Sequence, residues 1–106
     1  MKRIYIAGPM TGKPDLNRAE FDKAEDFIDE SSECDSISFN PHQIGRMLGW
    51  DEQTPIKAIA STLLPDLASC DAIYMLRGWE QSKGATAEHA VAKWIGLEII
   101  YQGEAE

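Results

Sequence analysis

Segments typical of buried strands alternate with helical segments along the whole chain. The strand-type segments are short, rich in β-branched, aromatic and apolar residues and bounded by turn signals; they cover 3–7, 36–40, 71–76 and 97–101. Apolar residues at helical spacing fill the intervals, over 16–28, 54–69 and 85–96. Such alternation predicts a parallel sheet with helices on both faces, connected by right-handed crossovers.

The length of the chain sets the number of domains. With 106 residues it makes one domain, because two halves would each be too small to bury a core. We therefore expect a single domain over 1–106: an α/β, Rossmann-like or flavodoxin-like three-layer sandwich with four parallel strands in the order 2-1-3-4.

Two segments are expected to depart from regular helix. Pro65 interrupts a helical pattern and predicts a kink or two successive helices. Residues 41–53 are expected to form an irregular excursion with one short helix.

The charge balance limits the partners. The 18 acidic residues against 10 Lys plus Arg give a net charge of −8. This argues against polymeric nucleic acid as a partner, because binding it requires neutralising many phosphates, but it is compatible with a small phosphorylated ligand.

The apolar run 4–7 is too short for a signal peptide, and no stretch approaches the ~20 apolar residues of a membrane helix. We expect no membrane partner, and the lone thiols Cys34 and Cys70 favour a cytoplasmic location.

Three loops are expected at the ligand-binding edge of the predicted sheet. Ligands of open parallel sheets bind beyond the carboxyl ends of the strands, which here places 8–14, 40–50 and 77–84 at the site. Gly8 and Gly12 leave room for the backbone to approach a ligand. The first loop lacks the ending of a P-loop and the spacing of a dinucleotide fingerprint, so a plain strand-to-helix turn is an equally good interpretation.

Glu88 is the most informative acidic residue. It lies near the start of the helix that follows the third strand, where the helix dipole and free N–H groups are expected to lower its pKa and keep it ionised as a nucleophile. The alternative, that it only complements the dipole, is from spacing alone the commoner case. His42 and His89 form no ligand grouping, so we expect no metal and no cofactor.

Three segments taken together resemble a known family. They read Tyr-Ile-Ala-Gly-Pro-Met-Thr-Gly at 5–12, Asp-Leu-Ala-Ser-Cys-Asp-Ala-Ile-Tyr-Met at 66–75 and Gly-Ala-Thr-Ala-Glu-His-Ala-Val-Ala at 84–92. In this order they resemble the nucleoside 2-deoxyribosyltransferase superfamily, which includes the deoxynucleoside 5′-monophosphate N-glycosidases and small phage-encoded relatives. The resemblance runs over most of the chain.

The resemblance implies a reaction and roles for three residues. Glu88 would attack C1′ of a 2-deoxyribosyl group and expel the base, leaving a glycosyl-enzyme intermediate. Asp66 would protonate or orient the departing base, and Tyr5 would position Glu88 by a hydrogen bond. The chemistry parallels that of retaining glycosidases, in which a carboxylate stabilises an oxocarbenium-like centre.

The resemblance also implies how substrate is held. The residues lining the sugar and base would be Gly8, Met10 and Gly12. Ser82 stands where the monophosphate-hydrolysing branch has a phosphate-binding serine and the transferase branch an aspartate, with Lys83 or Arg18 as helpers. This favours a deoxynucleotide over a deoxynucleoside as the small-molecule partner. By analogy a homo-oligomer, a dimer or larger, is also expected.

Two departures from the family pattern leave alternatives open. His89 follows the glutamate where the family usually has glycine, and the chain ends soon after the fourth strand. Either departure is compatible with an altered substrate or lost activity. We therefore carry two main hypotheses: a hydrolase (glycosidase) or transferase of nucleotide metabolism, and a catalytically silent nucleotide-binding or sequestering module. A small interaction protein without a ligand is the third. The sequence does not distinguish hydrolysis from transfer or identify the base.

Overall fold

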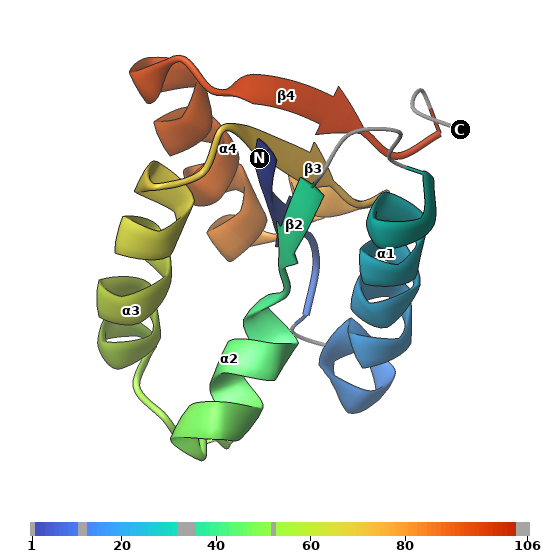
Figure 1. The fold of residues 1–106 in the computed structure, drawn as a ribbon. Helices are drawn as coiled ribbons and strands as arrows, with labels where there is room; N and C mark the ends of the chain where they lie inside the picture. The colour runs from blue at the N-terminus through green and yellow to red at the C-terminus, as the bar shows by residue number, and fades with distance from the viewer. Residues whose placement is uncertain (1, 11–12, 32–35, 52, 104–106) are drawn as a thin grey trace.

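A four-stranded parallel sheet forms the centre of the molecule. The computed structural model describes residues 2–10, 13–31, 36–51 and 53–103. Its strands are β1 (Lys2–Ala7), β2 (Ser36–Phe39), β3 (Ala72–Met75) and β4 (Glu98–Tyr101). Their order is β2-β1-β3-β4 and every neighbouring pair is parallel (Figure 1). This confirms the α/β fold class and the strand order expected from the sequence.

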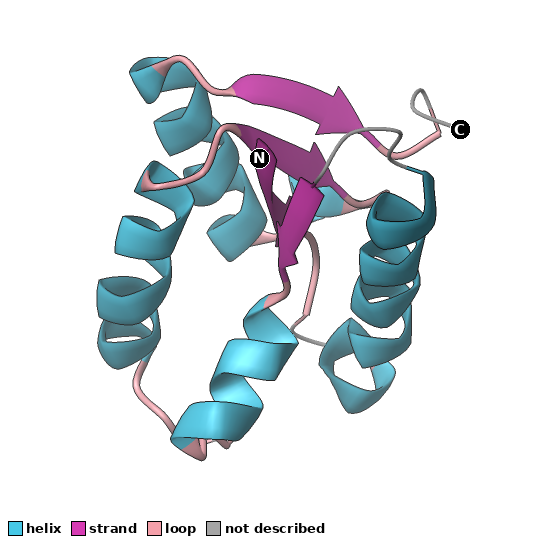
Figure 2. Cartoon of the chain, in the orientation of Figure 1, coloured by secondary structure: helices cyan, strands magenta, loops and turns pink. Residues whose placement is uncertain are grey.

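Helices cover both faces of this sheet (Figure 2). They are α1 (Arg18–Ser31), α2 (Pro41–Leu48), α3 (Ile56–Ala68) and α4 (Lys83–Ile95), with short 3-10 turns at Pro14–Asn17 and Trp79–Gln81. The first helix packs on one face, and α3 and α4 pack on the other. Among the described residues no helix is long and apolar enough to cross a membrane.

Two apolar cores follow from this layering. On the α1 face, Phe21, Ala24 and Ile28 are buried against Ile4 and Ile6 of β1. The opposite face holds a second cluster from β1, β3, α3 and α4, which contains Tyr5, Ala7, Leu63, Leu67, Cys70, Ile73, Met75, Ala85 and Ala92. Strands β1 and β3 are therefore buried on both sides, as expected for central strands of a parallel sheet.

A buried asparagine fixes the start of α2. Asn40 is only 2% exposed. Its side-chain oxygen accepts a hydrogen bond from the His42 backbone N–H at 3.0 Å, which caps the helix. Its amide nitrogen donates to the Asp22 carboxylate at 2.9 Å, so the same side chain ties the end of β2 to α1.

The third helix differs from its expected form. It runs as one element through Pro65, so the alternative of two successive helices is wrong. Leu63 and Leu67, four residues apart on either side of the proline, are buried in the same core. Their shared packing keeps the chain helical where the proline removes one backbone hydrogen bond.

The first helix also begins later than its apolar stripe suggests. Leu16 was expected to belong to that stripe, yet α1 starts only at Arg18. Asp15, Leu16 and Asn17 instead have positive φ angles of 49°, 53° and 64°, and Leu16 is 44% exposed. The left-handed turn changes the chain direction, so this leucine does not join the buried face of α1.

Candidate functional site: a buried tyrosine–glutamate pair

Tyr5 and Glu88 meet on the α3–α4 side of the sheet. Tyr5 lies in β1 and is fully buried, at 0% exposure. Its hydroxyl donates a short hydrogen bond of 2.5 Å to Oε2 of the half-buried Glu88 in the second turn of α4. The hydrogen bond that the family resemblance implies is therefore present. The catalytic roles of both residues remain predictions.

The sequence of α4 explains why Glu88 points inward. Ala85 and Ala92 are both buried, at 1% and 0% exposure. Glu88 follows the first by three residues and precedes the second by four, so all three share one helix face. The small alanines bring this face close to the sheet, and the carboxylate reaches the tyrosine hydroxyl.

The pKa of Glu88 differs from the sequence-based expectation. Burial raises the pKa of its carboxyl to about 7, and the hydrogen bond from Tyr5 lowers it by a smaller amount. The expected lowering by the helix dipole is wrong. The helix begins at Lys83, so Glu88 lies beyond the first turn with its free N–H groups and beside apolar side chains instead. Burial, with the charge of Glu88 as a smaller cause, raises the pKa of the Tyr5 phenol well above its usual value.

Asp66 approaches this pair from another direction. It lies in the last turn of α3, just before the amino end of β3. Its negative charge contributes to the raised pKa of Tyr5. Its backbone carbonyl accepts hydrogen bonds from the Ser69 hydroxyl at 2.7 Å and the Cys70 thiol at 3.2 Å. This position is at the opposite edge of the sheet from the loop after β1. The role of Asp66 toward a departing base stays a prediction.

The loop after β1 is tightly packed where it begins. A Cβ atom on Gly8 would lie 2.7 Å from the Leu76 Cβ, so the glycine allows the ends of β1 and β3 to approach each other. Met10 packs against the α1-side core. Gly12 lies outside the described residues.

Ser82 and Lys83 begin α4. The Ser82 hydroxyl oxygen accepts a hydrogen bond from the Ala85 backbone N–H at 3.2 Å and so caps the helix. Lys83 is exposed. Their proposed contact with a phosphate stays a prediction, and Arg18, the other expected helper, forms an ion pair with Asp22 at 3.6 Å.

Three aromatic rings that the sequence did not bring together contact one another around His89, the residue after Glu88. His89 stacks on Trp79 with ring centroids 4.2 Å apart, and its Nε2 lies 2.9 Å from the Tyr101 hydroxyl. Burial, with Lys93 as a smaller cause, lowers the pKa of His89, which favours the neutral ring. His89 therefore joins α4 to the 3-10 turn at Trp79–Gln81 and to β4. No periodic pattern signals this contact.

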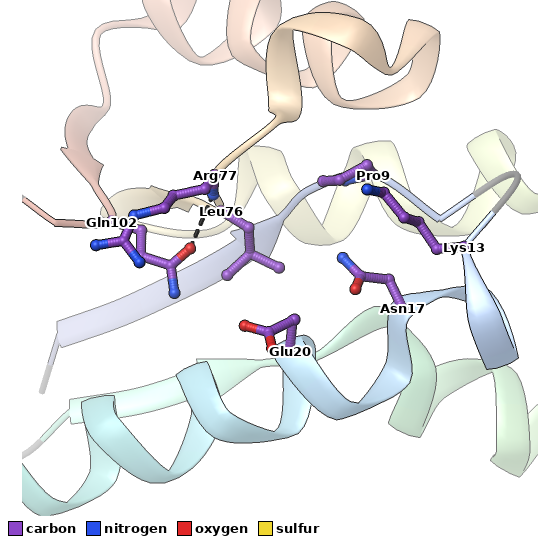
Figure 3. A pocket seen from close by; sticks show the side chains of 7 residues that line it. All are labelled: Pro9, Lys13, Asn17, Glu20, Leu76, Arg77 and Gln102. Atoms are coloured by element: carbon purple, nitrogen blue, oxygen red, sulfur yellow. Dashed lines mark hydrogen bonds between the residues drawn. The ribbon is translucent and has the colours of Figure 1, made fainter.

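A cavity lies at the carboxyl ends of β1 and β3, the edge where a ligand was expected, and two of the loops named there, 8–14 and 77–84, contribute to its lining. Its volume is about 170 Å³, and Figure 3 shows the side chains that line it: Pro9, Lys13, Asn17, Glu20, Leu76, Arg77 and Gln102. A larger and more open hollow of about 410 Å³ adjoins it over Trp79 and Tyr101. Glu88 lines neither hollow. In the described part of the chain, no group of three or more His, Cys, Asp or Glu side chains could hold a metal ion.

These features define a class of protein. The strand order reverses between β1 and β3, and open parallel α/β proteins bind their ligands at such a point. The molecule is thus a Rossmann-like α/β protein with a cavity at its switch point and a partly buried tyrosine–carboxylate pair on the other side of the sheet. More specifically, the chain belongs to the family described as domain of unknown function (DUF4406), which it matches over residues 2–101. No curated protein matches the sequence.

Proposed function

We propose that this protein cleaves or transfers at the N-glycosidic bond of a 2′-deoxynucleoside 5′-monophosphate, with Glu88 as the nucleophile. The observation that supports this most is the hydrogen bond between the buried Tyr5 hydroxyl and Glu88 Oε2. A carboxylate oriented by such a hydrogen bond suits attack on an anomeric carbon. The family resemblance supplies the substrate class.

The two carboxylate oxygens have different tasks in this reaction. Tyr5 holds Oε2, which fixes the plane of the carboxylate and leaves Oε1 to attack C1′. The new C1′–O bond forms as the C1′–N bond breaks, and the departing base takes the bonding electrons and then a proton. Water opens the resulting glycosyl ester in hydrolysis, whereas a second base opens it in transfer. No cofactor is required.

The protonation state of Glu88 sets the working pH of this reaction. Only the ionised carboxylate is a nucleophile, and its pKa of about 7 leaves part of the population protonated at neutral pH. In the second step Glu88 is esterified to C1′, so it departs as the carboxylate when water attacks, and the proton of that water passes to solvent.

One observation favours the alternative of a silent nucleotide-binding module. Asp66, the expected acid for the departing base, lies near the amino end of β3 rather than beside the loops at the carboxyl ends. A protein that binds but does not cleave needs no such acid. Both hypotheses are separated by one experiment.

The experiment measures release of free base from a panel of deoxynucleoside 5′-monophosphates by chromatography. We expect release by the wild type, and a loss on the order of a thousandfold or more in Glu88→Gln, because the nucleophile is removed. Glu30→Gln, an exposed carboxylate on α1, is the matched control and should retain full activity. Absence of free base together with a ligand-induced rise in melting temperature would establish the silent binding module instead.

A further inference from the structure

The cavity between the ends of β1 and β3 is rich in hydrogen-bond donors. Four of its polar side chains carry donors: Lys13, Asn17, Arg77 and Gln102. The first two come from the segment before α1, the third follows β3 and the last follows β4, so three separate loops converge (Figure 3). Two cations at one cavity are notable in a chain whose net charge is −8.

Three of these side chains, Lys13, Asn17 and Gln102, have donors available to a ligand. In the part of the chain that the structure describes, the Lys13 ammonium forms no ion pair and the Asn17 amide forms no hydrogen bond. The Gln102 carbonyl oxygen accepts the Arg77 backbone N–H at 2.8 Å. This contact fixes the orientation of the amide and leaves its NH₂ group to donate.

Glu20 is the single acidic group among the described lining residues. Its Oε1 is 3.4 Å from the Lys23 ammonium, which offsets part of its charge. A carboxylate beside several donors readily accepts a hydrogen bond from a hydroxyl group of the ligand, and it repels a ligand that is only an anion. The lining therefore fits a ligand that carries both an anionic group and a hydroxyl.

The size of the cavity limits the ligand further. A volume of about 170 Å³ is below the ~300 Å³ at which pockets begin to enclose drug-sized molecules. The start of α1, next to Asn17, adds the positive end of a helix dipole. Donors from several directions suit a tetrahedral phosphate with its multiple acceptor oxygens better than a planar carboxylate.

We propose that this cavity binds the phosphate group of a small phosphorylated polyol or sugar. The phosphate is held by Lys13, Arg77 and the side-chain amides of Asn17 and Gln102. Glu20 accepts a hydrogen bond from a hydroxyl group of the attached carbon chain. The cavity lies on the α1 side of the sheet, whereas Tyr5 and Glu88 pack on the opposite side. Binding here does not depend on the proposed chemistry at Glu88.

The test is an NMR titration that follows backbone amide shifts of the ¹⁵N-labelled protein. The probes are inorganic phosphate, glycerol 3-phosphate and glycerol. We expect the shifts to concentrate at Lys13, Asn17, Arg77 and Gln102, with glycerol 3-phosphate binding more tightly than phosphate and glycerol not binding. Shifts confined to Ser82 and Lys83 at the start of α4, or spread evenly over exposed lysines, would overturn the proposal.

Variants test the individual contacts. Lys13→Gln should weaken glycerol 3-phosphate binding by about tenfold, the usual effect of losing one hydrogen bond from a charged group. Lys57→Gln, another exposed lysine, is the matched control and should leave the affinity unchanged. Equal losses in both variants would indicate diffuse attraction and contradict a built site.

Two further variants separate the roles. Glu20→Gln should increase the affinity for inorganic phosphate, because it removes a negative charge that repels the anion. It should also reduce the preference for glycerol 3-phosphate, because it removes the strong acceptor for the ligand's hydroxyl group. An unchanged preference would show that Glu20 does not contact the ligand. Glu88→Gln should retain binding in full, which keeps a failure of this proposal distinguishable from a failure of the proposed reaction.

Discussion

At the scale of single residues, burial and hydrogen bonding have opposite effects on the pKa of one carboxyl group, that of Glu88. Burial raises the pKa of Glu88 to about 7, and the Tyr5 hydroxyl partly counteracts this rise. The pKa of the phenol itself lies far above the physiological range, so Tyr5 remains a donor throughout. The carboxylate is therefore the group whose titration governs any chemistry at this pair.

Removing the tyrosine hydroxyl should shift the pH dependence of the reaction. In the wild type, kcat/KM should rise with pH through about 7, because the proposed nucleophile is the ionised carboxylate. Tyr5→Phe removes the hydrogen bond that favours the ionised form, so the midpoint should move to higher pH. The measurement is the pH profile of base release for both proteins. An unshifted midpoint in the variant would contradict this coupling.

Glu88→Gln should stabilise the fold more at alkaline than at acidic pH. The folded-state pKa of Glu88 is raised, so the protonated form contributes stability at low pH that is lost as pH rises through about 7. Glutamine imitates the protonated form at every pH. We expect its advantage in the free energy of unfolding to grow by about 2 kcal/mol between about pH 5 and about pH 8.

Urea unfolding of both proteins across this pH range measures that difference, with Glu30→Gln as the matched control for losing an exposed carboxylate. A constant difference between wild type and Glu88→Gln would show that the side chain is solvated rather than buried.

At the scale of elements, the ends of β1 and β3 determine where ligands can enter. The strands lie side by side, and the Leu76 backbone N–H donates to the Ala7 carbonyl at 2.8 Å just before the chain turns away. Gly8 permits this approach because it has no side chain. The helices that follow leave on opposite faces of the sheet (Figure 1), so the cavity and the Tyr5–Glu88 pair lie on different sides.

Gly8→Ala should destabilise the protein by about 1–3 kcal/mol, the usual cost of overpacking. The added methyl group would lie 2.7 Å from both Cβ and Cδ1 of Leu76. Gly84→Ala is the matched control: nothing lies within 4 Å of its Cβ position, and it occupies the first turn of α4. The control should be neutral or slightly stabilising, because alanine favours helix. Thermal unfolding measures both, and equal stability of the two variants would contradict the close packing.

At the scale of the whole molecule, the sequence predicts the architecture better than the site. Alternating strand and helix patterns are local signals that every segment repeats, so the sheet and its order could be inferred. The hydrogen bond of Tyr5 to Glu88 followed from family resemblance. The sequence placed a ligand site at this edge of the sheet but did not single out Lys13, Arg77 and Gln102 as its lining, because they lie in three loops and share no local pattern. Burial, which reverses the expected pKa shift of Glu88, likewise arises only when helix and sheet pack together.

The burial of Tyr5 has a consequence for comparing family members. Packing alone at position 5 calls for a large ring and would be served equally by phenylalanine, since every atom except the hydroxyl contributes to the core. The oxygen is thus the one atom that the apolar packing does not require. If the proposed reaction is correct, tyrosine retained or replaced by phenylalanine at this position across related sequences would record whether each lineage has kept that chemistry, independently of whether it has kept the fold.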